Sequence, residues 1–431
     1  MPSYSSLTAE QVKQEISQLE SQYQYYSAQN LKLNMTRGKP CREQLDLSDG
    51  LLNILDKTHV QSADGIDCRN YGGLDGLPEA KSLFAGMLGL QPDQVMVLSH
   101  SSLNLMYDMV VRAMLFPVPG AVRAWCKEEK IRFLCPVPGY DRHFFITEST
   151  GIDMIPVPML PTGPDMDIVE RLTAQDSTIK GIWCVPVYSN PDGIVYSENT
   201  CRRLAGMTCA AADFRIFWDN AYVVHHLDLN QPQGTPEMLG LCAKAGNPDR
   251  VYEFASTSKI TWSGSGIASV AASPANLAYI RKQITAQTIG PDKMTQLRHV
   301  RFLKDQNGIM AMMARHADII RPKFDLVHQI LAADLADTGT CRWNRPQGGY
   351  FYSLFVRRGT ASETVNLAKA CGVEVTPAGS TWPYGKDPDD SNIRLAPTFP
   401  PLAELDKAVH ILTICIRLAA LHQLLNKENS Q

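Results

Sequence analysis

The most constraining feature of the sequence is an alternation, between residues 93 and 255, of short apolar runs with amphipathic stretches. The runs lie at residues 95–98, 131–136, 154–158, 182–187, 215–219 and 250–255. Each is long enough for a buried strand but too short for a buried helix. Strands that alternate with helices favour a mostly parallel sheet with helices on both faces. The sequence therefore predicts an α/β fold.

Composition and charge narrow the class of protein further. The chain has 431 residues, of which 44% are hydrophobic and 20% charged, which is typical of a well-buried globular protein with two or three domains. A net charge of -3 provides no basic field for a nucleic acid, and no block of like charges suggests a membrane surface. We expect partners that are small molecules or other copies of the chain, with no nucleic acid and no membrane.

The cysteines and the two ends of the chain indicate the cellular compartment in which the protein is expected. Eleven cysteines are scattered without a C-x-x-C pair, so we expect neither a disulfide framework nor a metal site. The N-terminus has no apolar signal region, and the late apolar segment 408–425 is interrupted by His410, Arg417 and His422. We predict that this segment is a buried helix and that the protein is cytoplasmic.

Two helix starts are readable near the N-terminus. Thr8 with Gln11 matches a capping box, and an apolar stripe follows at helical spacing, formed by Val12, Ile16, Leu19, Tyr23 and Tyr26. Further on, LKLN at residues 31–34 reads as a short strand, and a glycine-rich segment ends where a helix begins near Pro78.

Polar side chains follow five of the apolar runs, where ligands bind in parallel sheets. In chain order they are Ser101 and Ser102, Tyr140, Asn190, Asp219 with Tyr222, and Ser256 with Lys259. Taken singly each has an ordinary explanation: the serines and Asp219 as caps, Asn190 as a turn, Tyr140 as core and Lys259 as a surface loop residue. Their shared position at one edge favours a common site.

Together these residue types match the needs of one cofactor, pyridoxal phosphate. Its aldehyde requires an amine, and its phosphate requires donors at a helix N-terminus. Its ring nitrogen requires a carboxylate, its hydroxyl requires hydrogen-bond donors and its ring face an aromatic side chain. The sequence therefore predicts a pyridoxal-phosphate site at the strand ends.

The segments YSNPDG, WDNAY, STSK and NIRLAP, in this order, resemble the class I/II aminotransferases of pyridoxal-phosphate fold type I, over residues 30–425. More narrowly, LKLNMTRGKP, NYGGLDGLPEA, SLNLMYD, STSKIT, QLRHVRF and NIRLAPTFP resemble an aspartate aminotransferase branch related to MocR-type regulators. The resemblance implies a large cofactor-binding domain at 46–300 and a smaller α/β domain at 301–431, which residues 1–45 join.

The resemblance also implies roles for the cofactor-binding residues. Lys259 would bind the cofactor's aldehyde covalently and then move the substrate's α-proton, while Asp219 would pair with the ring nitrogen. The ring hydroxyl and face would be held by Tyr222, Asn190 and Tyr140, and the phosphate by Ser101, Ser102 and Ser256. Tyr71 would reach the phosphate of a neighbouring subunit, which implies a homodimer with shared sites.

Substrate-binding roles follow from the same resemblance. Arg394 matches the arginine that grips the α-carboxylate, for which a planar guanidinium fork is suited. Gly38 matches a glycine that lets the backbone approach the substrate, and Asn190 also faces it. A second carboxylate would need a further cation, for which Arg37, Lys39 and Lys293 are candidates.

One position departs from the family pattern. The family carries a phosphate-binding arginine seven or eight residues beyond the lysine, where this chain has Gly266 and Ile267. Lys293 or Arg37 would then be the replacement cation to examine.

The predicted activity is ping-pong transamination, most specifically from aspartate to 2-oxoglutarate, which gives oxaloacetate and glutamate. The alternatives on the same scaffold are an aromatic or alanine aminotransferase and a β-lyase. A non-catalytic ligand sensor is disfavoured, because the single helix that precedes the aminotransferase region is too short for a DNA-binding module.

Overall fold

The computed structural model describes residues 4–428 and is built on sheets of eight, three and two strands. The large sheet has the order β2-β9-β8-β7-β6-β3-β4-β5. Its strands are β2 (Val95–Ser99), β3 (Arg132–Val137), β4 (Asp153–Leu160), β5 (Gly163–Pro164), β6 (Ile179–Cys184), β7 (Arg215–Asp219), β8 (Val251–Ser256) and β9 (Ala268–Ala272). The five central strands from β8 to β4 run parallel, whereas β9 is antiparallel to both β2 and β8, and β5 is antiparallel to β4.

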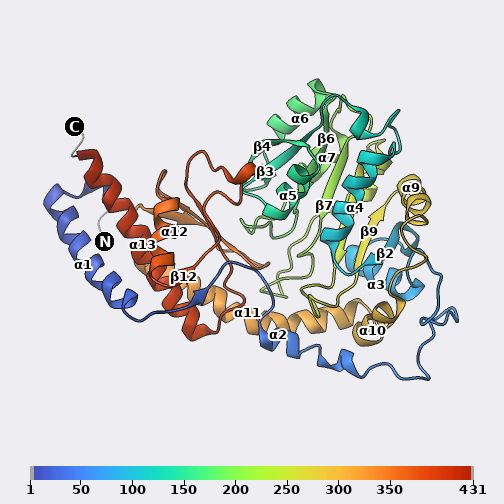
Figure 1. Cartoon of the computed structure of the whole chain (residues 1–431), viewed down its shortest axis with the longest axis horizontal. Helices are drawn as coiled ribbons and strands as arrows, with labels where there is room; N and C mark the ends of the chain where they lie inside the picture. The colour runs from blue at the N-terminus through green and yellow to red at the C-terminus, as the bar shows by residue number, and fades with distance from the viewer. Residues whose placement is uncertain (1–3, 429–431) are drawn as a thin grey trace.

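Helices cover both faces of the large sheet because alternate side chains of its strands point to opposite sides. Leu134, Ile182 and Trp218 pack with α3 (Pro78–Leu88), α6 (Met166–Gln175), α7 (Glu198–Gly206), α8 (Met238–Lys244) and α10 (Lys293–Leu303). Their neighbours Phe133 and Phe217 pack with α4 (Ser102–Leu115), α5 (Asp141–Ser149) and α9 (Pro274–Ile284). The predicted α/β class, with a mostly parallel sheet between two helical layers, is confirmed (Figure 1).

The smaller part of the molecule holds a second core. Its three-stranded sheet is antiparallel and consists of β10 (Cys341–Trp343), β11 (Tyr352–Val356) and β13 (Asn392–Leu395). A two-stranded sheet pairs β1 (Leu33–Asn34) with β12 (Val373–Glu374) in parallel. The core is completed by α12 (Ala361–Ala370), by α13 (Leu402–Glu428) and by part of α11 (Gln306–Leu335).

The N-terminal segment lies against this smaller part, at the left of Figure 1. Helix α1 (Ala9–Ser27) begins after Thr8, whose side chain forms the predicted capping box with Gln11. Its residues Val12 and Leu19 pack on α13. The short helix α2 (Arg42–Asp46) follows α1 and β1 in the chain and precedes the first strand of the large sheet. A strand near residue 33 and a helix from Pro78 are also found as predicted.

Helix α13 tests the prediction about the late apolar segment. It is long and apolar enough to cross a membrane, but 72% of its most apolar window is buried inside the protein. Its apolar residues face α1, α11 and α12. The prediction of a buried core helix is therefore confirmed.

Helix α11 joins the two cores. Ile309, Met312 and Met313 in its first half are buried in the core of the large sheet. Ile320 and the apolar residues after it belong to the core of the smaller part. Figure 1 shows this helix running beneath both parts. The change from one core to the other takes place between Met313 and Ile320.

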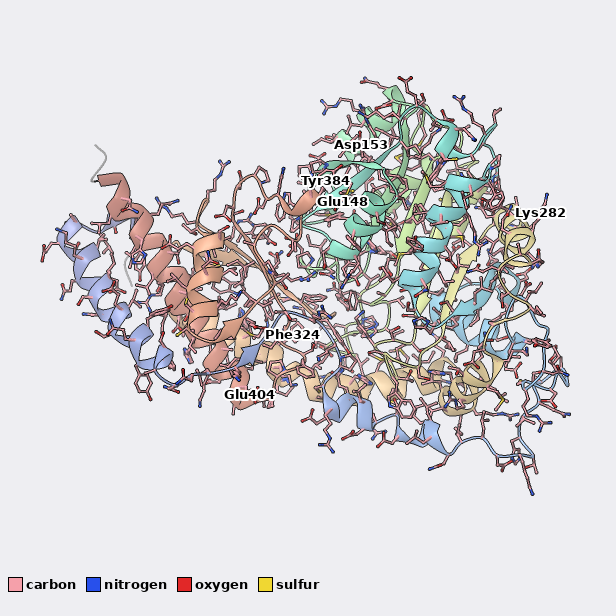
Figure 2. The ribbon with its side chains drawn as sticks, in the orientation of Figure 1. Glu148, Asp153, Lys282, Phe324, Tyr384 and Glu404 are labelled. Atoms are coloured by element: carbon pink, nitrogen blue, oxygen red, sulfur yellow. The ribbon has the colours of Figure 1, made fainter. Side chains whose placement is uncertain are left out.

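A second connection lies near residues 381–384. The amide of Gly139 donates to the carbonyl of Thr381 at 2.8 Å, and the amide of Met154 donates to the hydroxyl of Tyr384 at 3.0 Å. Figure 2 shows Tyr384 beside Glu148 and Asp153, on α5 and β4. The loop before β13 is thus held against the large sheet.

Candidate active site

Lys259 lies three residues beyond the end of β8, and its amine rests over the ring of Tyr222, 4.9 Å from the ring centre. Burial lowers the pKa of Lys259, and the negative charge of Asp219 opposes that shift in part. A lysine whose pKa is lowered is deprotonated more readily, and a neutral amine is the form that attacks a carbonyl carbon. The carbonyl of Lys259 also accepts hydrogen bonds from His225 and Tyr350, at 3.3 and 3.4 Å.

Asp219, the last residue of β7, is buried and partly unpaired. Its Oδ2 lies 3.1 Å from Nε2 of His143, whereas its Oδ1 has no hydrogen-bond partner within residues 4–428. Buried carboxylate oxygens are rarely left without a partner. A protonated ring nitrogen would supply the missing donor, so this residue fits the pyridine ring of pyridoxal phosphate.

His143 is itself firmly placed. Its ring stacks on Trp183 with centres 4.5 Å apart and planes 12° from parallel. The Trp183 indole donates to the hydroxyl of Thr147 at 2.8 Å, and that hydroxyl donates to the His143 carbonyl at 2.7 Å. The orientation of Asp219 is therefore set by a histidine that the sequence analysis did not single out.

Tyr222 and Tyr140 lie near Asp219, and both remain protonated at neutral pH. Burial raises the pKa of Tyr222 well above its usual value, and the nearby Tyr140 and Asp219 add to the shift. Burial also raises the pKa of Tyr140. Tyr222 can therefore donate a hydrogen bond, and Tyr140 presents a neutral aromatic ring.

The predicted phosphate serines lie at strand and helix ends. Ser101 caps helix α4, and its hydroxyl accepts from the amide of Asn104 at 3.4 Å. Ser102 is the first residue of that helix, where unpaired backbone amides favour an anion. The hydroxyl of Ser256 donates to that of Ser258 at 3.1 Å. All three serines are partly exposed and available to a ligand.

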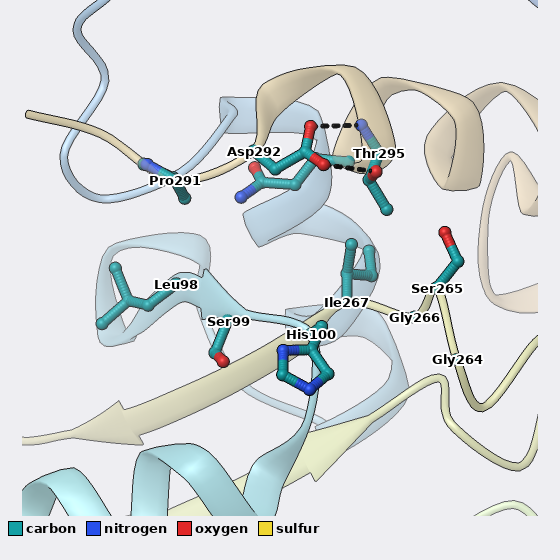
Figure 3. Close-up of a pocket in the computed structure, with 11 residues that line it drawn as sticks. Leu98, Ser99, His100, Gly264, Ser265, Gly266, Ile267, Pro291, Asp292 and Thr295 are labelled. Atoms are coloured by element: carbon teal, nitrogen blue, oxygen red, sulfur yellow. Dashed lines mark hydrogen bonds between the residues drawn. The ribbon is translucent and has the colours of Figure 1, made fainter. Parts of the chain in front are cut away.

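A polar cavity of about 370 Å³ lies where the family arginine was expected (Figure 3). Ser99, His100, Gly266 and Asp292 are among its lining residues, which include neither arginine nor lysine. A side-chain carbon added to Gly266 would come within 3.1 Å of the Thr257 hydroxyl and 3.2 Å of the His100 carbonyl. A side chain at position 266 would therefore press against these two oxygens unless they shifted slightly.

The amine of Lys293 is held by a backbone carbonyl. It is buried, and its amine donates to the carbonyl of Gly72 at 2.7 Å. It thus fixes the loop that carries Tyr71, whose side chain is 78% exposed. Lys293 therefore supports the position of Tyr71, and its amine is already bound to a backbone carbonyl.

Arg394 is buried on β13, with its guanidinium 5.1 Å from the ring centre of Phe351. Its Nη1 donates to Oδ1 of Asn190 at 3.3 Å and to Oδ1 of Asp141 at 2.7 Å. The structure therefore brings Arg394 and Asn190 together, as the substrate assignment requires, and adds Asp141.

The segment Arg37–Lys39 contacts Phe351 through Gly38. A side-chain carbon at Gly38 would come within 2.5 Å of the Phe351 ring, so any larger residue there would force that ring to move. Lys39 places its amine 3.9 Å above the ring centre of Phe399. Arg37 is exposed, and no hydrogen bond or ion pair of its side chain is found within the described chain.

Sequence reasoning missed His143 and Asp141 because both lie in the first turn of α5, where polar residues are ordinary. The usable signal was the spacing YDRH, which places His143 three residues after Tyr140 and hence on the same helix face. No comparable signal marked Asp141, whose partner is 253 residues away.

A doubly covered parallel sheet, a lysine and an acid at its strand ends, and a buried arginine on a second sheet define an aminotransferase of fold type I. The profile of the family described as aspartate amino-transferase matches residues 7–428. The chain belongs to the aspartate aminotransferase family.

Known relatives cover nearly all of the chain. An aspartate aminotransferase of Corynebacterium glutamicum is 45% identical over 411 residues, which span 95% of this chain and 93% of that protein. The crystal structure of an aspartate transaminase from Corynebacterium glutamicum superposes with a TM-score of 0.95 at 43% identity, covering 98% and 99% of the two chains. The α-aminoadipate aminotransferase of Thermus thermophilus shares the fold, with a TM-score of 0.73 at 20% identity over 91% and 93%.

Proposed function

We propose that this transaminase transfers the amino group of aspartate to 2-oxoglutarate in a ping-pong reaction, with pyridoxal phosphate as cofactor. The observation that carries the proposal is the buried Asp219 carboxylate, which has an unpaired oxygen and lies within electrostatic reach of Lys259. The name of the 45% identical relative supports aspartate as the amino donor. The Thermus thermophilus structure, which contains a phosphopyridoxyl-leucine adduct, supports the cofactor.

The cofactor would be held by residues from several strand ends. Lys259 would bind it covalently, Asp219 would face its ring nitrogen, and Tyr140 would cover the ring face. The ring hydroxyl would be bound by Tyr222 and Asn190, and the phosphate by Ser101, Ser102 and Ser256. When bound, pyridoxal phosphate supplies an electron sink next to the substrate's α-carbon.

The chain's own residues perform the binding and proton transfer. Arg394 and Asn190 orient the α-carboxylate, and Gly38 lets the Phe351 ring pack directly on the backbone beside them. Lys259, once its amine is free, would act as the base that accepts the proton from the substrate's α-carbon. Its lowered pKa suits this work, because a general base is most effective when its pKa lies near the working pH.

Arg37 is our candidate for the distal carboxylate of aspartate. Its neighbour Lys39 already rests on the ring of Phe399, whereas the side chain of Arg37 is exposed and can turn to a ligand. Arg37 is also the neighbour in sequence of Gly38, which packs against the Phe351 ring, and the guanidinium of Arg394 lies 5.1 Å from the centre of the same ring. A substrate with two carboxylates would thus have one cation for each.

The assembly and setting belong to the same proposal. We propose a homodimer in which the exposed Tyr71 reaches the phosphate site of the partner subunit, in a cytoplasmic protein of the branch related to MocR-type regulators. The division of the chain into a large domain of residues 46–300 and a smaller domain of residues 301–431, joined by residues 1–45, stays a prediction. It is supported by the separate cores of the two sheets. A cytoplasmic setting is consistent with eleven free cysteines.

The test is a comparison of half-reactions on the purified holoenzyme. Aspartate, alanine, phenylalanine and cystathionine are each mixed with the protein, and loss of the cofactor's visible absorbance band is followed. Aspartate should react with the highest kcat/KM. A clear preference for alanine, phenylalanine or cystathionine would instead establish one of the alternative activities.

Two variants test the residue assignments. Lys259→Ala should lose the visible band of the covalently bound cofactor, and a retained band would refute the anchor. Asp219→Ala should fold normally but lose turnover by about 100-fold or more, because it removes the charge opposite the ring nitrogen. An unaltered rate would refute this role.

A further inference from the structure

The arginine assigned to the substrate carboxylate already binds a carboxylate of the chain. Nη1 of Arg394 lies 2.7 Å from Oδ1 of Asp141, and the two residues are 253 positions apart in sequence. Arg394 is only 6% exposed, whereas the side chain of Asp141 is 33% exposed. The arginine is fixed in the interior, and its partner has access to solvent.

The hydrogen bonds of Arg394 leave one end of the guanidinium for a ligand. Nη1 also donates to Asn190 at 3.3 Å, and Nε donates to the hydroxyl of Thr376 at 3.4 Å. Within the described residues no hydrogen bond of Nη2 is found. A carboxylate binds a guanidinium best through two parallel hydrogen bonds. A ligand that uses the Nη1–Nη2 end must therefore compete at Nη1 with Asn190 and with Asp141, the nearer of the two acceptors and the only charged one.

Two carboxylates at one guanidinium also repel each other, so a bound ligand and Asp141 oppose one another in the same place. When no ligand is bound, Arg394 still needs a negatively charged partner. A buried guanidinium without a counter-charge is costly, and Asp141 removes that cost when no substrate is present.

Displacement of Asp141 needs only a local movement. Asp141 begins α5 beside the large sheet, whereas Arg394 lies on β13 in the smaller part. The same two parts stay connected nearby by the Gly139–Thr381 and Met154–Tyr384 hydrogen bonds. The carboxylate can therefore turn into solvent while the loop before β13 stays in place.

We propose that Asp141 is an internal stand-in for the substrate's α-carboxylate, which holds Arg394 between turnovers and is displaced when a substrate binds. The inference rests on the proposed function, in which Arg394 binds that carboxylate. Asp141 is a positioning residue on this view. Its charge weakens the binding of every ligand carboxylate that uses Arg394, and it leaves the subsequent proton transfer unchanged.

The test uses the holoenzyme and two variants without the charge, Asp141→Asn and Asp141→Ser. The probe is maleate, a dicarboxylate that cannot be transaminated, titrated by calorimetry. Its Kd should fall about two- to five-fold in both variants, the range expected when a part-exposed ion partner is removed. The KM for aspartate should fall by the same factor, while kcat stays within about two-fold.

Asp176→Asn is a matched control. Asp176, whose side chain is 25% exposed, pairs with Nη1 of Arg132 at 2.7 Å, but Arg132 is the more exposed arginine and begins β3, at the end of the strand away from the site. This variant should leave the maleate Kd unaltered.

The outcomes separate the two proposals. Equal or weaker maleate binding by the Asp141 variants would overturn the inference, because it would mean that Asp141 only orients Arg394 for the ligand. Maleate binding by the wild type without turnover of aspartate would overturn the proposed function alone. Failure of the wild type to bind maleate would overturn both.

Discussion

Replacement of His143 by phenylalanine tests the electrostatic arrangement around Asp219. Phenylalanine keeps a flat ring that can stack on Trp183, but it removes the nitrogen 3.1 Å from Oδ2 of Asp219. Because Oδ1 has no partner in the described structure, the buried carboxylate would then be unpaired at both oxygens. Loss of a hydrogen bond to a charged buried group costs about 1.5–3 kcal/mol. We expect His143→Phe to lower the free energy of unfolding of the apoenzyme by about 2 kcal/mol.

The measurement is urea denaturation of wild type and variant, each with and without pyridoxal phosphate. The loss should be smaller in the holoenzyme, because the cofactor's ring nitrogen would restore one partner to Asp219. His410→Phe is the control: His410 lies 3.1 Å from Asp334, but both side chains are partly exposed, and Asp334 also accepts from Thr413. It should lose less than about 1 kcal/mol. Equal losses at the two positions, or no effect of the cofactor, would refute the reasoning.

Three further changes have outcomes that follow from single contacts. Gly38→Ala places a carbon 2.5 Å from the Phe351 ring, which would have to move. The variant should fold but raise the KM for aspartate about ten-fold or more. An unchanged KM would show that the contact between position 38 and Phe351 does not affect substrate binding. Lys293→Met leaves the Gly72 carbonyl without its buried donor and should raise the Kd of pyridoxal phosphate about ten-fold, as measured by equilibrium dialysis. An unchanged Kd would show that the loop that carries Tyr71 takes no part in cofactor binding. Burial raises the pKa of Glu253 from 4.5 to about 8, so the native state keeps a proton that the unfolded chain releases. Stability should fall as pH rises between those values, and Glu253→Gln should flatten that fall in urea midpoints from about pH 5 to about pH 9; parallel curves would contradict it.

The central strands could be predicted because their apolar runs are short and bounded by polar segments. The run at 215–219 coincides with β7, and the run at 250–255 differs from β8 by one residue. Strand β6 begins three residues before its run, because Lys180 and Gly181 interrupt the apolar pattern. Lys180 is buried nonetheless, since it pairs with Asp213 at 2.8 Å.

Strand β9 was missed for a different reason. Its sequence, ASVAA, has little strand propensity and only one large apolar residue. It is wholly buried between β2 and β8, so tertiary packing decides its conformation. Local pattern carries no information about such a strand.

The site was predictable to the extent that its residues end strands. Asp219 is the last residue of one apolar run and Lys259 lies four residues beyond the next, and their proximity results from parallel neighbours in the sheet. Asp141 and His143 could not be found in this way, because their partners are set by the packing of a helix against another strand or sheet. The cavity at Gly266 was equally invisible, although the missing arginine was apparent in the sequence.

Helix α11 has a consequence for how the protein unfolds. Its 30 residues form one continuous element, whose first half completes one core and whose second half completes the other. Melting of either half would expose apolar side chains and also fray the helix into the remaining core. The two sheets should therefore lose their structure together, as one cooperative unit with a single calorimetric transition, although each has its own hydrophobic interior.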